Sequence, residues 1–157
     1  MTLRPDQLKQ PRVLAIASGG GHWVQLRRMA AAFEGHDVAY VTTMKGYRQQ
    51  VGDARFYVVV DGSRWNKCRL AWMAAQLLLV LLRERPDVVI STGAAPGYFG
   101  IRLGKMLGMR TIWVDSMANA ERLSLCGERV GRYADLWLTQ WPHLASTDGP
   151  AYAGSVL

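Results

Sequence analysis

The fold of this chain is decided by a stretch near its N-terminus, Arg12-Val13-Leu14-Ala15-Ile16-Ala17-Ser18-Gly19-Gly20-Gly21-His22. The run before Ser18 is largely apolar and predicts a strand. The apolar residues after His22 recur at helical spacing, as Leu26, Met29, Ala30 and Phe33. Glycines between a strand and a helix let a ligand approach the backbone, and the first helical turn adds free N–H groups with partial positive charge. The stretch therefore predicts a phosphate-binding βα turn, with His22 at its mouth.

This glycine turn alone does not identify a ligand. It matches neither G-x-G-x-x-G nor G-x-x-x-x-G-K-[ST], so it indicates neither a dinucleotide site nor a P-loop. The alternative is that its glycines serve only the packing of a helix on a strand. Ligand sites gather at such turns in open α/β sheets, which favours the binding interpretation.

Composition indicates one folded domain with anionic partners. The chain has 157 residues, half of them hydrophobic, which is enough for a core of its own. We expect a flexible N-terminal lead over residues 1–11 and a single Rossmann-like domain over residues 12–157. The net charge of +7 favours nucleic acid, an acidic membrane surface or phosphorylated ligands. Because aromatic residues are not interleaved with basic clusters, no nucleic-acid partner is expected.

Metal chemistry is not expected either. The sequence has no D-x-D motif, and His22, His36 and His143 lack the spacing of metal ligands. Cys68 and Cys126 form no C-x-x-C pair. A G-x-S-x-G motif is also absent, which argues against a hydrolase. We therefore predict a site without a metal or another bound cofactor.

Alternating apolar segments predict the rest of the fold. Further strands are expected at residues 36–43, 56–60, 87–91, 111–115 and 136–139, and helices at residues 70–82 and 98–107. This order is typical of a parallel sheet with helices on both faces. Unusual turns follow three of the strands, at residues 19–22, 92–97 and 115–124. Because the carboxyl ends of parallel strands share one edge, we expect these turns to build one site.

Two side chains at that edge are candidates for proton transfer, His22 and Asp115. Histidine suits the removal of a proton from a hydroxyl group near neutral pH. For Asp115 the alternative is a carboxylate that caps the loop after its strand. Glu121, in the same loop, is more typical of an exposed surface charge.

The most apolar segment, residues 70–82, is too short to cross a membrane. At about 1.5 Å per residue it spans roughly 20 Å, against about 30 Å for the hydrocarbon core of a bilayer. Only Gln76 interrupts it, and basic residues flank both ends. One interpretation is a fully buried helix. The other is a helix with one face in a membrane surface, which it contacts through Trp72, Leu78 and Leu81.

Four segments occur in the order found in a known family: Ser18-Gly19-Gly20-Gly21-His22, Ser91-Thr92-Gly93-Ala94-Ala95-Pro96, Asp115 to Gly127, and Thr139-Gln140-Trp141-Pro142. Together they resemble the membrane-associated, acceptor-side subunit of two-component GT-B glycosyltransferases, which serve dolichol-linked oligosaccharide and bacterial exopolysaccharide or capsule assembly. The resemblance covers nearly the whole chain. The eukaryotic members have Glu in place of Asp115 and Arg in place of Asn119, so the resemblance points to a bacterial branch.

The resemblance implies the Rossmann-like N-terminal half of a GT-B enzyme, active only with a separate donor-binding subunit similar to the C-terminal half. The pair would move a sugar such as glucuronate or N-acetylglucosamine from a UDP-sugar co-substrate to a polyprenyl-diphosphate-linked glycan. It implies peripheral attachment to the cytoplasmic face of the bacterial inner membrane. The helix at residues 70–82, basic residues or the partner would provide that attachment, since we recognise no N-terminal anchor like the family's.

The resemblance also implies roles for individual residues. His22 would be the base on the acceptor hydroxyl, with Asp115 as a second catalytic candidate. The acceptor diphosphate would lie against Ser18, Gly19, Gly20, Gly21, Thr92, Gly93, Pro96 and Gly97. The cleft toward the partner would be lined by Ser116, Asn119, Glu121, Ser124, Gln140 and Trp141. From the residues alone, an alternative of another class is a non-catalytic Rossmann-like module that binds a nucleotide or a phosphorylated ligand.

Overall fold

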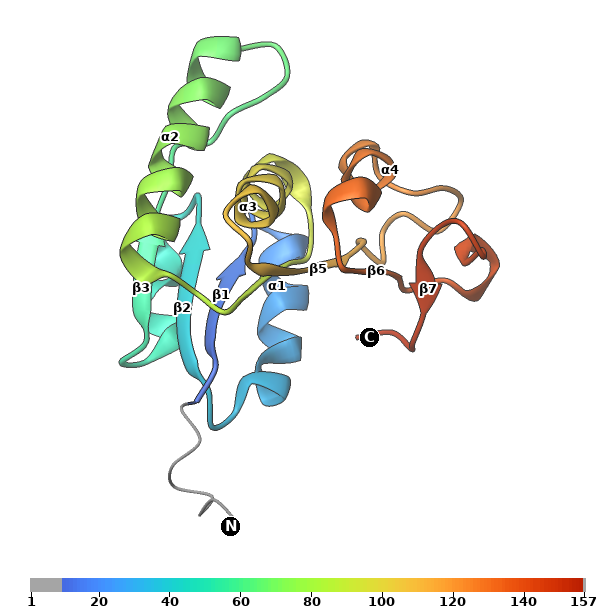
Figure 1. Ribbon diagram of the computed structural model, residues 1–157, viewed down its shortest axis with the longest axis horizontal. Helices are drawn as coiled ribbons and strands as arrows, with labels where there is room; N and C mark the ends of the chain where they lie inside the picture. Colours follow the sequence, from blue (N-terminus) through green and yellow to red (C-terminus); the bar gives the residue numbers. More distant parts are fainter. Residues whose placement is uncertain (1–9, 157) are drawn as a thin grey trace.

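Seven parallel strands form one sheet in the computed structural model, in the order β3-β2-β1-β4-β5-β6-β7 (Figure 1). The structure describes residues 10–156, so most of the expected N-terminal lead, residues 1–9, lies outside the described residues. The strands are β1 (Arg12–Ile16), β2 (Asp37–Thr42), β3 (Arg55–Val58), β4 (Val88–Ser91), β5 (Arg110–Val114), β6 (Leu136–Thr139) and β7 (Ala151–Tyr152). The α-helices are α1 (Gly21–Arg28), α2 (Lys67–Glu84), α3 (Ala94–Met106) and α4 (Leu125–Val130). Short 3₁₀ helices are η2 (Met29–Phe33), η3 (Lys45–Val51), η4 (Gly131–Tyr133) and η5 (Pro142–Leu144).

The strand order reverses at β1, which pairs with β2 on one side and with β4 on the other. Ile16, the last residue of β1, lies beside Val41 in β2 and Ser91 in β4. The turns that follow β1 and β4 therefore begin side by side at the carboxyl edge of the sheet. Ligands bind at such a reversal in open α/β sheets.

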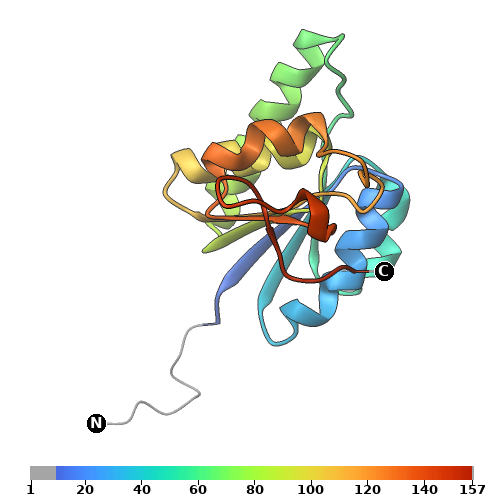
Figure 2. The ribbon, with the colours of Figure 1, turned by 90° about the vertical axis from the view of Figure 1, so that its right-hand side faces the viewer.

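Helices cover both faces of the sheet, as predicted. α2, α3 and α4 lie over one face and α1 lies over the other (Figures 1 and 2). Because side chains alternate along a strand, β1 contributes to both cores. Leu14 and Ile16 pack in the core under α2 and α3, and Val13 and Ala15 pack with Trp23 of α1.

The observed elements differ from the predicted ones mainly toward the C-terminus. α3 begins at Ala94 rather than at Tyr98, so Pro96 lies in its first turn instead of a loop. Proline is tolerated there because the first N–H groups of a helix have no helical acceptor. Neither α4 nor β7 is predicted from the sequence, since six and two residues are too few to show a periodic pattern.

α2 has one buried and one exposed apolar face. Leu81 is fully buried in the core, which corrects its predicted membrane contact, and Leu78 is half-buried. The exposed face is formed instead by Trp72, Leu79 and Leu82, which are 58%, 65% and 49% exposed. No helix within residues 10–156 is long and apolar enough to span a membrane.

Candidate functional site

His22 is held against the turn after β4 by two hydrogen bonds. Its Nδ1 lies 3.0 Å from the carbonyl oxygen of Thr92, and Oγ1 of Thr92 donates to the carbonyl oxygen of His22 at 2.7 Å. Because a carbonyl oxygen only accepts, Nδ1 carries the hydrogen in this contact, and a neutral ring keeps its lone pair on Nε2. The half-buried imidazole is therefore held in the tautomer that a general base needs.

The turn between β4 and α3 is shaped around this imidazole. Gly93 has a φ of 137°, a conformation that favours glycine. A Cβ at Gly93 would lie 2.5 Å from Nδ1 of His22, so a side chain there would displace the ring. Ala94 follows with a φ of 65°, in the left-handed region, a strain that the surrounding contacts must hold.

The glycine turn after β1 packs against the loop after β2. The Gly19 N–H donates to Oγ1 of Thr43 at 3.3 Å, and the Gly20 N–H donates to the hydroxyl of Tyr47 at 2.9 Å. Tyr47 also stacks on Trp23 of α1, with ring centroids 4.9 Å apart. Two N–H groups that we expected to face a phosphate thus have acceptors within the protein. The N–H groups of the first turn of α1 are left for a ligand.

Pro96 and Gly97 do not face this site, which corrects their predicted contact with the diphosphate. Both are buried in the first turn of α3. A Cβ at Gly97 would overlap the side chain of Ser91 and press on Trp113. Gly97 therefore serves the close packing of α3 on the sheet.

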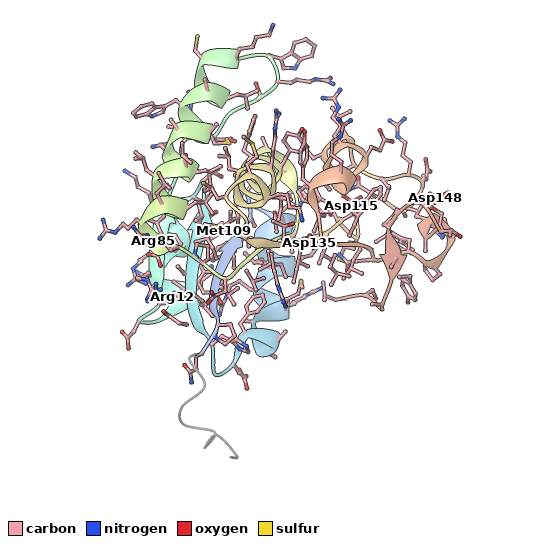
Figure 3. All side chains as sticks on the ribbon, viewed as in Figure 1. Arg12, Arg85, Met109, Asp115, Asp135 and Asp148 are labelled. Atoms are coloured by element: carbon pink, nitrogen blue, oxygen red, sulfur yellow. The ribbon has the colours of Figure 1, made fainter. Side chains whose placement is uncertain are left out.

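Asp115, labelled in Figure 3, is a buried carboxylate that holds its own loop. Its Oδ2 accepts from the Ser124 N–H at 2.9 Å, and its Oδ1 accepts from Oγ of Ser124 at 2.6 Å and from Nε1 of Trp113 at 3.1 Å. Ser124 in turn caps α4, its Oγ accepting from the Gly127 N–H at 2.8 Å. These contacts favour the capping alternative for Asp115 over proton transfer.

Gln25 of α1 ties the loop after β5 to the end of β6. Its Nε2 donates to Oγ of Ser116 at 3.1 Å, and its Oε1 accepts from the Met117 N–H at 3.2 Å and from Nε2 of Gln140 at 2.7 Å. We call Gln25, Ser116 and Gln140 the glutamine clamp. Gln25 is polar and is not one of the apolar residues at helical spacing (Leu26, Met29, Ala30 and Phe33), yet only 3% of it is exposed.

The clamp corrects the prediction that Ser116 and Gln140 face a partner subunit, because both are buried. Both polar atoms of the Gln140 side chain have hydrogen-bond partners within the chain. Its Nε2 also donates to the Asp115 carbonyl oxygen at 2.9 Å, and its Oε1 accepts from the Val156 N–H at 2.9 Å. Of the other residues expected at the cleft, Glu121 is exposed and Asn119, Ser124 and Trp141 are half-buried.

Titratable groups near the site are few. Burial raises the pKa of the Cys126 thiol, and the negative charge of Asp115 adds to that rise. Among residues 10–156 no three His, Cys, Asp or Glu side chains lie together so that they could hold a metal ion.

The main charge cluster lies at the opposite, amino edge of the sheet, near Arg12 and the end of α2 (Figure 3). Glu84 accepts from Nε of Arg55 at 2.9 Å and from the hydroxyl of Tyr57. Arg55 also pairs with Asp37 at 2.9 Å. Burial and the hydrogen bond to Glu84 raise the pKa of Tyr57. This cluster joins α2 to the sheet and takes no part in the site.

Solved structures with a similar fold include MurG of Acinetobacter baumannii, with a TM-score of 0.75 and 14% identity over 91% of this chain and 45% of that chain. UDP-N-acetylglucosamine 2-epimerase of Rickettsia bellii has a TM-score of 0.70 and 14% identity, over 94% of this chain and 45% of that chain. The corresponding epimerase of Methanocaldococcus jannaschii has a TM-score of 0.67 and 15% identity, over 82% and 39%. These likenesses confirm the predicted fold, a Rossmann-like sheet equivalent to the N-terminal half of a GT-B glycosyltransferase.

The sequence is similar to the UDP-N-acetylglucosamine transferase subunit ALG14 of Yarrowia lipolytica, with 33% identity over 69 residues. The matched part is 40% of this chain and 32% of that protein. The chain thus spans about a third of this curated relative and less than half of the similar structures. No protein-family model matches the chain.

Proposed function

We propose that this chain is the membrane-associated, acceptor-binding subunit of a two-chain glycosyltransferase. The pair moves a sugar, such as glucuronate or N-acetylglucosamine, from a UDP-sugar to a polyprenyl-diphosphate-linked glycan in exopolysaccharide or capsule biosynthesis, without a metal. Two findings support the proposal: the fold corresponds to 45% of MurG, and one segment resembles a transferase subunit. A half of this fold supplies one wall of a cleft, so a donor-binding partner similar to the C-terminal half supplies the other.

The observation that carries the proposal is the oriented imidazole of His22 at the reversal of strand order. Its Nε2 takes the proton of an acceptor sugar hydroxyl as that oxygen attacks the anomeric carbon of the UDP-sugar. The bond from this carbon to the UDP oxygen breaks, and UDP leaves with the electron pair. The Thr92 carbonyl, 3.0 Å from Nδ1, stabilises the imidazolium that forms.

The acceptor diphosphate binds at the first turns of α1 and α3 in this proposal. These turns begin side by side, next to Gly21 and Gly93, and each presents backbone N–H groups with partial positive charge. The wall around the anion is formed by Ser18, Gly19, Gly20 and Thr92. These residues contact the anion without donating hydrogen bonds to it, because the donors named here already have acceptors in the chain.

Membrane attachment uses the exposed face of α2 and the loop before it. The first turns of α2 extend beyond the sheet in both views (Figures 1 and 2). Trp65 is 82% exposed beside this end, and Arg64, Lys67 and Arg69 are exposed around it. Apolar side chains that enter the interface, with cations near acidic head groups, hold a helix on a membrane surface. In this proposal the surface is the cytoplasmic face of the bacterial inner membrane.

The test is affinity capture of the tagged full chain from detergent-solubilised membranes of its own host, with mass spectrometry of the captured proteins. We expect a small partner in a stoichiometric amount, with the sequence features of a sugar-nucleotide-binding half. If no such partner is captured and the chain alone binds a nucleotide, it is a non-catalytic binding module and the proposal fails.

A further inference from the structure

A groove lies between the start of α2 and α4, above the first turns of α3. Its volume is about 340 Å³, within the range of about 300–1,000 Å³ typical of ligand pockets. Its apolar walls include Leu70 of α2, Tyr98 and Phe99 of α3, and Leu125 of α4. We call this space the α2–α4 groove.

The charges of the α2–α4 groove are all of one sign. Arg64 and Arg129 line it, and no carboxylate does. Both arginines are exposed, and neither forms an ion pair with another residue of the described range 10–156. The Arg64 guanidinium lies 4.7 Å above the ring of Trp65, which holds it beside the groove. An apolar channel with two unpaired cations fits a ligand that joins a hydrocarbon chain to an anion.

The groove lies next to the site along the start of α3. Ala95 lines it and is separated by a single residue from Gly93, which contacts the His22 ring. At its other end Arg64 adjoins Trp65 and the exposed face of α2. A ligand with its sugar at His22 can therefore place its diphosphate at the start of α3 and run its chain toward the membrane-facing helix.

We propose that the α2–α4 groove holds the first isoprene units of the acceptor's prenyl chain, with Arg129 neutralising charge of the diphosphate at one end and Arg64 lying toward the membrane at the other. This proposal rests on the proposed function, because it names the part of the acceptor that enters the groove. It also gives a role to the apolar side chains of three helices that line the groove.

The test uses the two cysteines of the full chain as reporters. Cys126 lines the groove and is partly buried, whereas Cys68 is exposed on α2 and outside the lining. The rate of maleimide modification of each cysteine is measured by mass spectrometry with and without farnesyl diphosphate. We expect about tenfold protection of Cys126 at a ligand concentration of ten times Kd, with no change at Cys68. Inorganic diphosphate alone should not protect Cys126.

Two variants locate the ligand. Arg129→Gln should raise the concentration of farnesyl diphosphate needed for half-protection severalfold, whereas Arg132→Gln, which changes an exposed arginine outside the lining, should not. Leu125→Asp places a carboxylate on the groove wall and should abolish protection, and circular dichroism checks that it folds. No protection in the wild type, or equal protection by inorganic diphosphate, would overturn the proposal.

The two proposals fail separately. If the chain and its partner transfer sugar but farnesyl diphosphate does not protect Cys126, the groove assignment is wrong and the proposed function stands. If Cys126 is protected but no partner supports transfer, the groove assignment stands and the proposed function is wrong.

Discussion

The two sides of the carboxyl edge are built in opposite ways. On the α1 side, the glutamine clamp is buried and its amide and hydroxyl groups are hydrogen-bonded to one another and to the backbone. On the α2 side, the α2–α4 groove and the outer face of α2 leave apolar side chains open to solvent. The α1 side thus uses its polar groups to fix loops, and the α2 side leaves an open apolar surface, which the two proposals assign to a ligand and a membrane. His22 stands where the two sides meet.

The largest effect is expected at that meeting point. His22→Ala removes the proposed base and should lower the rate of sugar transfer by the assembled pair about 10²–10⁴-fold, without weakening subunit association. His36→Ala, at an exposed histidine before β2, is the matched control and should leave the rate unchanged. Steady-state transfer with both variants checks this, and full activity of His22→Ala would remove the imidazole from the mechanism.

The two faces of α2 provide the next comparison. Leu81→Glu buries a carboxylate in the core and should destabilise the protein by more than about 3 kcal/mol. Leu79→Glu changes an exposed residue and should leave folding intact while weakening binding to anionic vesicles at least about tenfold. Urea unfolding and vesicle co-sedimentation measure the two effects. Vesicle binding by Leu79→Glu that equals the wild type would show that this face does not touch the membrane.

The sequence could not assign these faces. Residues 77–82 are all apolar, so no periodicity separates Leu81, which packs in the core, from Leu79, which does not. By contrast, the strand, glycine turn and helix start of residues 12–22 were predictable, because each part has its own local signal. The position of His22 at the carboxyl edge follows from those signals alone.

The glutamine clamp should show a smaller effect, on stability. Gln140→Leu leaves the Val156 N–H and the Asp115 carbonyl without their side-chain partner. A polar group shielded from water and left without a hydrogen-bond partner costs about 1–3 kcal/mol. We expect a loss of this size in urea unfolding. Gln49→Leu, at an exposed position of η3, makes the same chemical change on the surface and should be neutral. Equal stability of the two variants would mean that the clamp does not hold the loops.

The hydrogen bonds of the glutamine clamp could not be predicted from the sequence either, for another reason. Gln25 bonds to Gln140, 115 residues away, and a single polar residue in an amphipathic helix carries no sign of burial. Thr43 and Tyr47 accept hydrogen bonds from N–H groups of the glycine turn. Thr43 is the last residue of the strand expected at residues 36–43, and Tyr47 lies in the polar residues after it, and neither position carries a local sign of these contacts. Long-range partners of this kind become visible only once the strand order is known.

The smallest effect is expected for an ion pair that lies away from both the glutamine clamp and the α2–α4 groove. Lys105 at the end of α3 bonds to Asp135, and this bond lowers the pKa of Asp135. A carboxyl with a lowered folded-state pKa adds stability above its unfolded pKa and loses it as the pH falls through the folded one. Lys105→Met should therefore reduce stability by about 0.2–1 kcal/mol at neutral pH, since both groups are exposed, and should have a smaller effect in acid. Unfolding at pH 7 and below pH 3 measures this.

Sugar transfer by the purified pair tests most directly whether this chain is the acceptor-binding subunit. The chain, its captured partner, a labelled UDP-sugar and a polyprenyl-diphosphate-linked glycan in lipid vesicles are mixed, and each protein is also assayed alone. We expect labelled lipid-linked product only when both proteins are present. Equal transfer by the partner alone would contradict this expectation, because the acceptor would then need nothing from this chain.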